Sequence, residues 1–205
     1  AVFKACYGLT SIDIPNSLTT ITGETFMSCS SLVTVSINPT LSQLETIGEQ
    51  AFWNCDDLTS IDLPDSLITI EREAFNHCNN LTSIILPDKL ITIMNNAFQG
   101  CNQIQNIIIP NSVTLIDNIA FSGCTVLESI TIPYNVEIIG PTAFSECPAL
   151  INVVIQNPLT VVSTDSFTNV SGNTGSNITF YNTNATNSDI TSLSANWQII
   201  ATSYA

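Results

Sequence analysis

One residue pattern recurs through most of this chain and restricts its fold more than any other feature. The pattern reads Leu-x-x-Ile-x-Ile-Pro-x-x-Leu-x-x-Ile-x-x-x-x-Phe-x-x-Cys, and its clearest copy spans residues 58–80. Its phenylalanines follow one another at steps of 23 residues, with a single step of 26, at Phe3, Phe26, Phe52, Phe75, Phe98, Phe121, Phe144 and Phe167. A fixed period of this size indicates a solenoid, in which stacked repeats bury their apolar faces in one shared core.

Each repeat predicts two short extended pieces. In its first half, apolar and polar residues alternate, β-branched residues are frequent and a proline closes the segment in most copies, as expected for a short strand. The second half is too short for a long helix. It fits another extended piece, followed by a turn or 3₁₀-like segment that inserts the phenylalanine and the cysteine. We therefore expect a β-rich solenoid with a parallel sheet of one short strand per repeat.

The repeats define one elongated body over residues 1–172, with a partial first repeat at 1–8 and seven full repeats after it. The second full repeat carries three extra residues within 40–43, where we expect a small bulging loop. Because the chain opens inside a repeat, we expect a fragment, a processed form or an incompletely traced chain.

Residues 173–205 change character and predict a C-terminal capping segment. Residues 178–181 read as one more strand that completes the sheet. Residues 188–197 can form a short helix with one apolar face. A cap of this kind would cover the last open edge of the solenoid.

The charge balance excludes one large class of partners. The chain has 17 acidic residues and three basic ones, Lys4, Arg72 and Lys89, which give a net charge of −14. Phosphate backbones are bound by lysine and arginine, so we expect no nucleic acid partner. No apolar run approaches the roughly 18 residues of a membrane span, so we also expect no direct membrane insertion.

The repeat resembles the BspA-type leucine-rich repeat, whose copies read L-x-x-I-x-I-P-x-x-V-x-x-I-x-x-x-A-F-x-x-C. The Ala-Phe pair occurs here at Ala51-Phe52, Ala74-Phe75, Ala97-Phe98, Ala120-Phe121 and Ala143-Phe144. The Ile/Leu-Pro pair occurs at Ile14-Pro15, Leu63-Pro64, Leu86-Pro87, Ile109-Pro110 and Ile132-Pro133. The edge copies depart from the pattern, with Val170 in place of the cysteine. The resemblance implies a leucine-rich-repeat solenoid that serves as a surface-associated binding or adhesion module, and it implies no catalytic residues.

Seven cysteines stand one per repeat, each three residues after the phenylalanine, at Cys6, Cys29, Cys55, Cys78, Cys101, Cys124 and Cys147. A straight column does not converge on a point, as a zinc or iron–sulfur site requires. Parallel side chains also do not suit the perpendicular torsion of a disulfide. We predict buried free thiols that fill a small apolar slot.

No other constellation predicts chemistry. The single histidine, His77, falls at an outward turn position, away from any nucleophile and orienting carboxylate. The acidic pairs Asp56-Asp57 and Glu71/Glu73 do not recur from repeat to repeat and fit a solvated face better than an acid–base or calcium site. We therefore expect no enzymatic activity, no metal and no cofactor.

The outward-facing residues of the main strands, which form one column along the solenoid, give the strongest indication of function in the sequence. This column reads Asp13, Ser36, Asp62, Ile85, Ile108, Thr131 and Val154. Exposed apolar residues in its second half suggest a contact surface, although β-branched residues also simply favour strands. We predict that a neighbouring column of Ile68, Ile91, Leu115 and Ile138 continues this apolar stripe around the edge. The candidate partner-binding residues are therefore Ile85, Ile108, Thr131, Val154, Ile68, Ile91, Leu115 and Ile138.

Two functions fit these observations. The first is a protein-binding or adhesion module of a secreted or surface-displayed protein. The second is a structural assembly component, such as a fibre, coat or virion protein, that uses the same surfaces for self-association. Glycosylation sequons stand at Asn80, Asn169, Asn177 and Asn184, and their use requires a eukaryotic secretory route.

Overall fold

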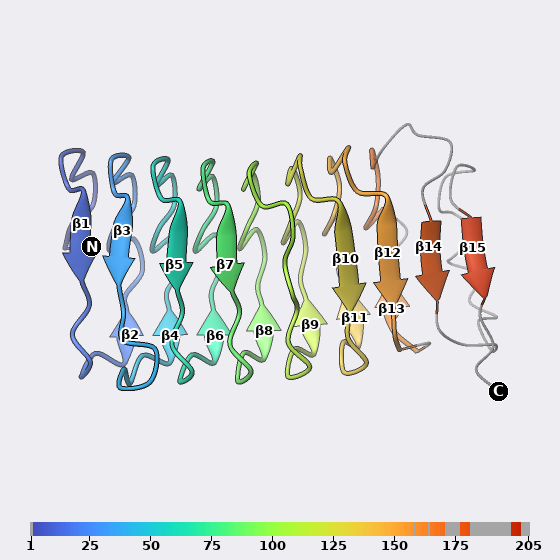
Figure 1. The fold of residues 1–205 in the computed structure, drawn as a ribbon, viewed down its shortest axis with the longest axis horizontal. Coiled ribbons are helices and arrows are strands. Elements are labelled where there is room, and N and C mark those ends of the chain that lie inside the picture. The colour runs from blue at the N-terminus through green and yellow to red at the C-terminus, as the bar shows by residue number, and fades with distance from the viewer. Residues whose placement is uncertain (1, 158, 164, 171–176, 181–197, 202–205) are drawn as a thin grey trace.

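The computed structural model describes residues 2–157, 159–163, 165–170, 177–180 and 198–201, which form a parallel β-solenoid. Most turns of the solenoid have a front strand, a tight turn, a shorter back strand and an irregular segment that returns to the front (Figure 1). Within the described residues there is no helix, and hence none long and apolar enough to cross a membrane. The predicted repeat architecture is confirmed, with two strands in most repeats.

The front strands, which we call the front layer, stack in parallel from one repeat to the next. They are β1 (Ser11–Asp13), β3 (Thr34–Ser36), β5 (Ser60–Asp62), β7 (Ser83–Ile85), β10 (Ser129–Ile132), β12 (Asn152–Ile155), β14 (Asn177–Phe180) and β15 (Gln198–Ala201). Equivalent residues pair across repeats, as in Ile61 with Ile84 and Ile130 with Val153. The alternation of side chains along a strand therefore holds along the whole layer.

The second strands form the back layer, a continuous seven-stranded parallel sheet in the order β13-β11-β9-β8-β6-β4-β2. Its members are two residues long: β2 (Thr20–Ile21), β4 (Thr46–Ile47), β6 (Thr69–Ile70), β8 (Thr92–Ile93), β9 (Leu115–Ile116), β11 (Ile138–Ile139) and β13 (Val161–Val162). The second residue of each strand is an isoleucine or valine that packs in or against the core.

The front layer is paired in three separate groups, β1-β3, β5-β7 and β10-β12-β14-β15. The first interruption coincides with the predicted loop at 40–43. There the Asn38 side-chain oxygen accepts hydrogen bonds from the backbone N–H groups of Thr40 at 3.1 Å and Leu41 at 2.9 Å, and Leu41 is exposed. The second interruption lies at residues 104–109, where Asn106 keeps an isolated bridge to Ser129.

The returning segments form a third ladder of hydrogen bonds, which we call the turn ladder. The N–H groups of Gln50, Phe52 and Asn54 donate to carbonyls of the next turn, at Arg72, Ala74 and Asn76. Alternate donors adopt positive φ, so polar side chains and glycines are favoured there. The observed residues are Ala5, Glu24, Ser28, Gln50, Asn54, Glu73, His77, Asn96, Gly100, Ile119, Gly123, Thr142, Glu146 and Asn169.

The core consists of ladders of identical or similar side chains. The eight phenylalanines stack with ring centroids 5.2–5.4 Å apart and ring planes within 15° of parallel. Offset stacking at this spacing adds to the free energy gained from burying the rings. Leucine, isoleucine, alanine and cysteine ladders fill the space around them, and nearly all of these side chains are fully buried from Leu32 to Val153.

The C-terminal strands extend the front layer beyond the recognisable repeats. β14 pairs with β12, which confirms the strand predicted at 178–181 for residues 178–180; residue 181 lies outside the described residues. β15 pairs with β14 and was not expected from the sequence, because its residues lie outside the repeat pattern. The predicted helix at 188–197 lies outside the described residues, and the capping role of 173–205 stays a prediction.

Candidate protein-binding face

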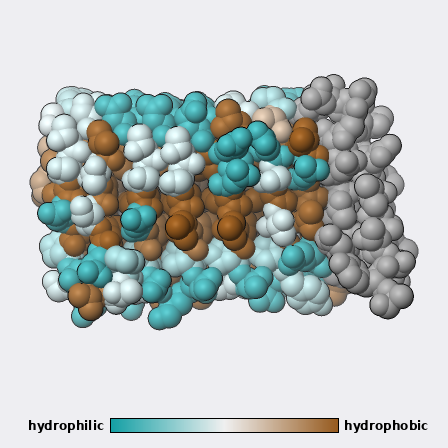
Figure 2. Space-filling view, viewed as in Figure 1, coloured by the Kyte–Doolittle hydropathy of each residue, from teal (hydrophilic) through white to brown (hydrophobic). Residues whose placement is uncertain are grey.

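The outward column of the front layer places two isoleucines in solvent. Ile85 is 74% exposed and Ile108 is 84% exposed, the highest values among isoleucines in the described chain. Thr131 is exposed and Val154, its partner in the strand pairing, is half-buried. Figure 2 shows a hydrophobic band that runs along the solenoid axis. Four predicted residues therefore share one face.

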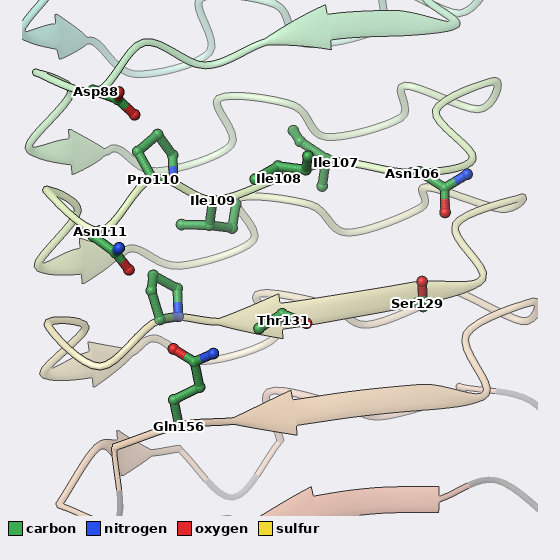
Figure 3. Close-up of a pocket in the computed structure, with 11 residues that line it drawn as sticks. Asp88, Asn106, Ile107, Ile108, Ile109, Pro110, Asn111, Ser129, Thr131 and Gln156 are labelled. Carbon is green, nitrogen blue, oxygen red and sulfur yellow. The ribbon is translucent and has the colours of Figure 1, made fainter.

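A groove of about 460 Å³ opens beside Ile108 on this face. Its lining combines isoleucines and prolines with polar side chains from four successive turns (Figure 3). The lining residues are Asp88, Asn106, Ile107, Ile108, Ile109, Pro110, Asn111, Ser129, Thr131, Pro133 and Gln156. Of these, the sequence analysis named only Ile108 and Thr131 as candidate binding residues. The strand-closing prolines were a usable signal, because they recur at one edge of the front layer.

The groove coincides with the second interruption of the front layer. Within the described residues, no strand pairing or backbone hydrogen bond joins β7 to residues 104–109. The back layer stays paired at the same level through β8 and β9. In this described part of the chain, the front surface therefore lacks strand pairing on the side of Ile85 that faces Ile108.

The prediction that Ile68, Ile91, Leu115 and Ile138 form one column is wrong. The Ile91 N–H donates to Ile68, and the Thr114 N–H donates to Ile91, both at 3.0 Å, so Thr114 continues that column. Leu115 instead pairs with Thr92 and with Ile138. The four residues form two adjacent columns that differ by one position along the chain.

These residues also do not continue the front stripe around the edge. They belong to the back layer or precede it directly, whereas Ile85 belongs to the front layer. Between Ile85 and Ile91 the chain passes through exposed Asp88 and Lys89. Ile91 and Ile138 are about half exposed, while Ile68 and Leu115 are less so. A polar edge therefore separates two apolar surfaces that face different directions.

The few cations of the chain are largely paired away from this face. Lys4 lies 2.7 Å from Glu24 and holds the pKa of that carboxyl below its usual range, through a hydrogen bond and charge attraction. Arg72 forms an ion pair with Glu49 and lies 3.8 Å from Glu73. On the front layer, Asp13 and Asp62 are exposed. The face thus joins an acidic half to an apolar half.

The cysteine prediction is confirmed: all seven cysteines are free, and all except Cys6 are buried. Burial raises the pKa of the Cys55 and Cys147 thiols to about 12 and raises those of Cys78, Cys101 and Cys124 well above the usual value. A protonated, inaccessible thiol is a poor nucleophile and a poor metal ligand.

The described residues bring no acid–base or ligating cluster together. No group of three or more His, Cys, Asp or Glu side chains in that part of the chain could hold a metal ion. His77 is exposed, as predicted, and contacts Trp53 with a ring-centroid distance of 6.5 Å. Of the sequon residues, Asn80 and Asn169 are exposed, and their glycosylation stays a prediction.

These features define a leucine-rich-repeat solenoid with one partly apolar strand face. The model of the BspA-type leucine-rich repeat region matches residues 1–47 and 45–174, with six copies. The chain therefore belongs to the BspA-type leucine-rich repeat family. Repeats of this family are typically non-enzymatic and generally serve protein–protein interaction. A search of curated proteins found no match.

Three solved structures are similar to this chain. A leucine-rich repeat protein of T. pallidum is 27% identical, with 84% of this chain and 73% of that chain covered and a TM-score of 0.66. One from Bacteroides ovatus is 25% identical, with 86% and 56% covered and a TM-score of 0.57. The pneumococcal vaccine antigen PcpA shares the fold at 18% identity, with 95% and 68% covered and a TM-score of 0.54. The chain spans just over half of the B. ovatus protein.

Proposed function

We propose that this chain is a non-enzymatic protein-binding or adhesion module of a secreted or surface-displayed protein, and that it binds through the front layer around Ile85 and Ile108. The observation that carries the proposal is the exposure of these two isoleucines, 74% and 84%, beside an open groove. Contiguous apolar groups with a polar rim are typical of contact surfaces. Membership of the BspA-type leucine-rich repeat family supports the class of function.

Site-specific photo-crosslinking tests the face directly. A photoreactive residue replaces Ile85 in one variant and Ile91, on the back layer, in a matched control. Both variants are incubated with intact host cells or purified extracellular matrix proteins, and adducts are identified by mass spectrometry. We expect a discrete protein adduct from position 85 that Ile108→Asp abolishes. Equal adducts from both positions, or adducts insensitive to Ile108→Asp, would overturn the proposal.

Self-association through the front layer is the second candidate, because the exposed side chains of Ile85 and Ile108 are equally available to a second copy of the chain. Light scattering behind size exclusion over a range of concentrations separates the two functions. A monomer throughout favours a foreign partner, and a concentration-dependent oligomer that Ile85→Asp dissociates favours self-assembly.

A further inference from the structure

The surroundings of the apolar patch restrict the kind of partner that fits it. The patch is defined here by Ile85, Ile108, Thr131 and Val154, together with the groove beside Ile108. Asp62 is paired in register with Ile85, so the backbones of the two residues lie one strand spacing, roughly 4.8 Å, apart and their side chains share one face. The apolar part of the patch therefore begins directly beside an exposed acid.

Two further carboxylates border the patch at its other edges. Asp88 is exposed and lines the groove together with Ile108. Glu128 is exposed and immediately precedes Ser129, another lining residue, and it accepts a hydrogen bond from the Gln105 side chain at 2.8 Å. Acidic groups from three different turns thus stand around one apolar surface.

Little positive charge within the chain offsets these acids. Lys4 and Arg72 are engaged by Glu24 and Glu49, which leaves Lys89, the residue after Asp88, as the one cation near the patch. The whole chain carries a net charge of −14. An acidic partner would meet repulsion along its whole approach, whereas a cationic one is attracted and steered.

We propose that the patch binds a cationic segment of a partner polypeptide, in which an apolar side chain is flanked by lysine or arginine. This inference rests on the proposed function and specifies its partner class. The apolar side chain would cover Ile85 and Ile108, and the flanking cations would meet Asp62 and Asp88. From Asp62 to Val154 the patch spans four repeat steps, about 19 Å, which matches roughly six residues of extended chain.

Three synthetic peptides of nine residues test the partner class. One peptide alternates valine with lysine, the second alternates valine with serine and the third alternates valine with glutamate, and each carries a fluorophore. Binding is measured by fluorescence anisotropy between about 50 and 300 mM salt, because surface charges become screened over roughly this range. We expect the lysine peptide to bind, with affinity that falls as salt rises, and the glutamate peptide not to bind. Equal binding of the serine and lysine peptides, independent of salt, would overturn the cationic class while leaving the binding face intact.

Matched charge variants locate the site. Asp62→Asn with Asp88→Asn removes two charges from the patch, and Glu45→Gln with Glu137→Gln removes two from exposed positions near the back layer. We expect the first pair to weaken binding of the lysine peptide about five- to tenfold and the second pair to change it less than twofold. Equal losses in both pairs would show non-specific attraction and overturn the inference. Binding that also survives Ile85→Ser, which removes the apolar side chain without adding charge, would overturn the proposed face itself.

Discussion

The thiol of Cys78 donates a hydrogen bond to the backbone carbonyl of Phe52, in the preceding turn, at a sulfur–oxygen distance of 3.1 Å. The same carbonyl accepts the N–H of Cys55, in its own turn, at 3.2 Å. Equivalent thiol bonds of 3.0–3.4 Å join Cys29 to Phe3, Cys55 to Phe26, Cys101 to Phe75, Cys124 to Phe98 and Cys147 to Phe121. The cysteines therefore link successive turns, which explains why a small residue with a donor group recurs there.

The buried position of these thiols predicts their reactivity. In the folded chain we expect a thiol reagent such as iodoacetamide to label Cys6, which is half-buried, before any of the other six. Unfolding in guanidinium should expose all seven, because each is a free cysteine. Intact mass spectrometry counts the labels in each state. Several labels on the native protein would contradict the ladder.

Stability should fall in alkaline solution because of the same thiols. Burial raises the pKa of Cys55 and Cys147 from 9.0 to about 12, so above pH 9 the unfolded chain loses protons that the folded chain retains. Stability from these groups is complete below pH 9 and is lost as the pH rises toward 12. Each thiol contributes a slope of about 1.4 kcal/mol per pH unit in this window.

Urea unfolding at several pH values between 8 and 11 measures this slope. Cys55→Ala should reduce the slope by the contribution of one thiol, although it also lowers stability at neutral pH by removing a hydrogen bond. An unchanged slope in this variant would show that other groups cause the alkaline loss.

The phenylalanine ladder predicts a gradient of mutational effects along the solenoid. Phe75 is fully buried between Phe52 and Phe98, with centroid distances of 5.2 and 5.4 Å. Phe75→Ala should lower the free energy of unfolding by about 3–5 kcal/mol, because it removes a ring and leaves a cavity. Phe3→Ala is the matched control, since Phe3 is only partly buried. Equal losses in urea unfolding would argue against a shared continuous ladder.

The interruption of the front layer predicts uneven amide exchange. Residues 104–109 lack strand pairing to β7, whereas β10 and β12 pair over four residues. Amide hydrogens in a peptide covering 104–110 should therefore exchange faster than those in the equivalent peptide at 150–156. Hydrogen exchange with mass spectrometry makes the comparison in one sample. Equal protection of the two peptides would contradict the interruption.

The sequence predicted the repeat architecture because a 23-residue period constrains every turn in the same way. It correctly predicted that Ile61, Phe75 and Cys78 are buried, because the residue types at the inward positions vary little from one repeat to the next. It failed at Leu115, where a leucine beside an isoleucine suggested the wrong column. Strand register depends on backbone pairing, and two neighbouring apolar residues do not reveal which of them pairs with Thr92.

The groove beside Ile108 was not predictable for a related reason. It lies where the strand pairing of residues 104–109 with the next turn is reduced to the isolated Asn106–Ser129 bridge, although residues 104–109 read Ile-Gln-Asn-Ile-Ile-Ile and have strong strand character. A repeat pattern describes what successive turns share, whereas the groove arises where one turn differs from its neighbours.

The glycine at Gly140 is required by close backbone approach, and its substitution gives the last prediction. A Cβ atom there would lie 2.7 Å from the backbone nitrogen of Asn118, in the preceding turn, which is too close for a real contact. Gly140→Ala should therefore lower the free energy of unfolding by about 1–3 kcal/mol, because the turns must separate to admit the methyl group. At Gly8 a Cβ meets nothing within 4 Å, so Gly8→Ala serves as the control and should change stability by less than about 0.5 kcal/mol. Both variants are compared with the parent by urea unfolding, and equal stability of the two would refute the close contact between turns.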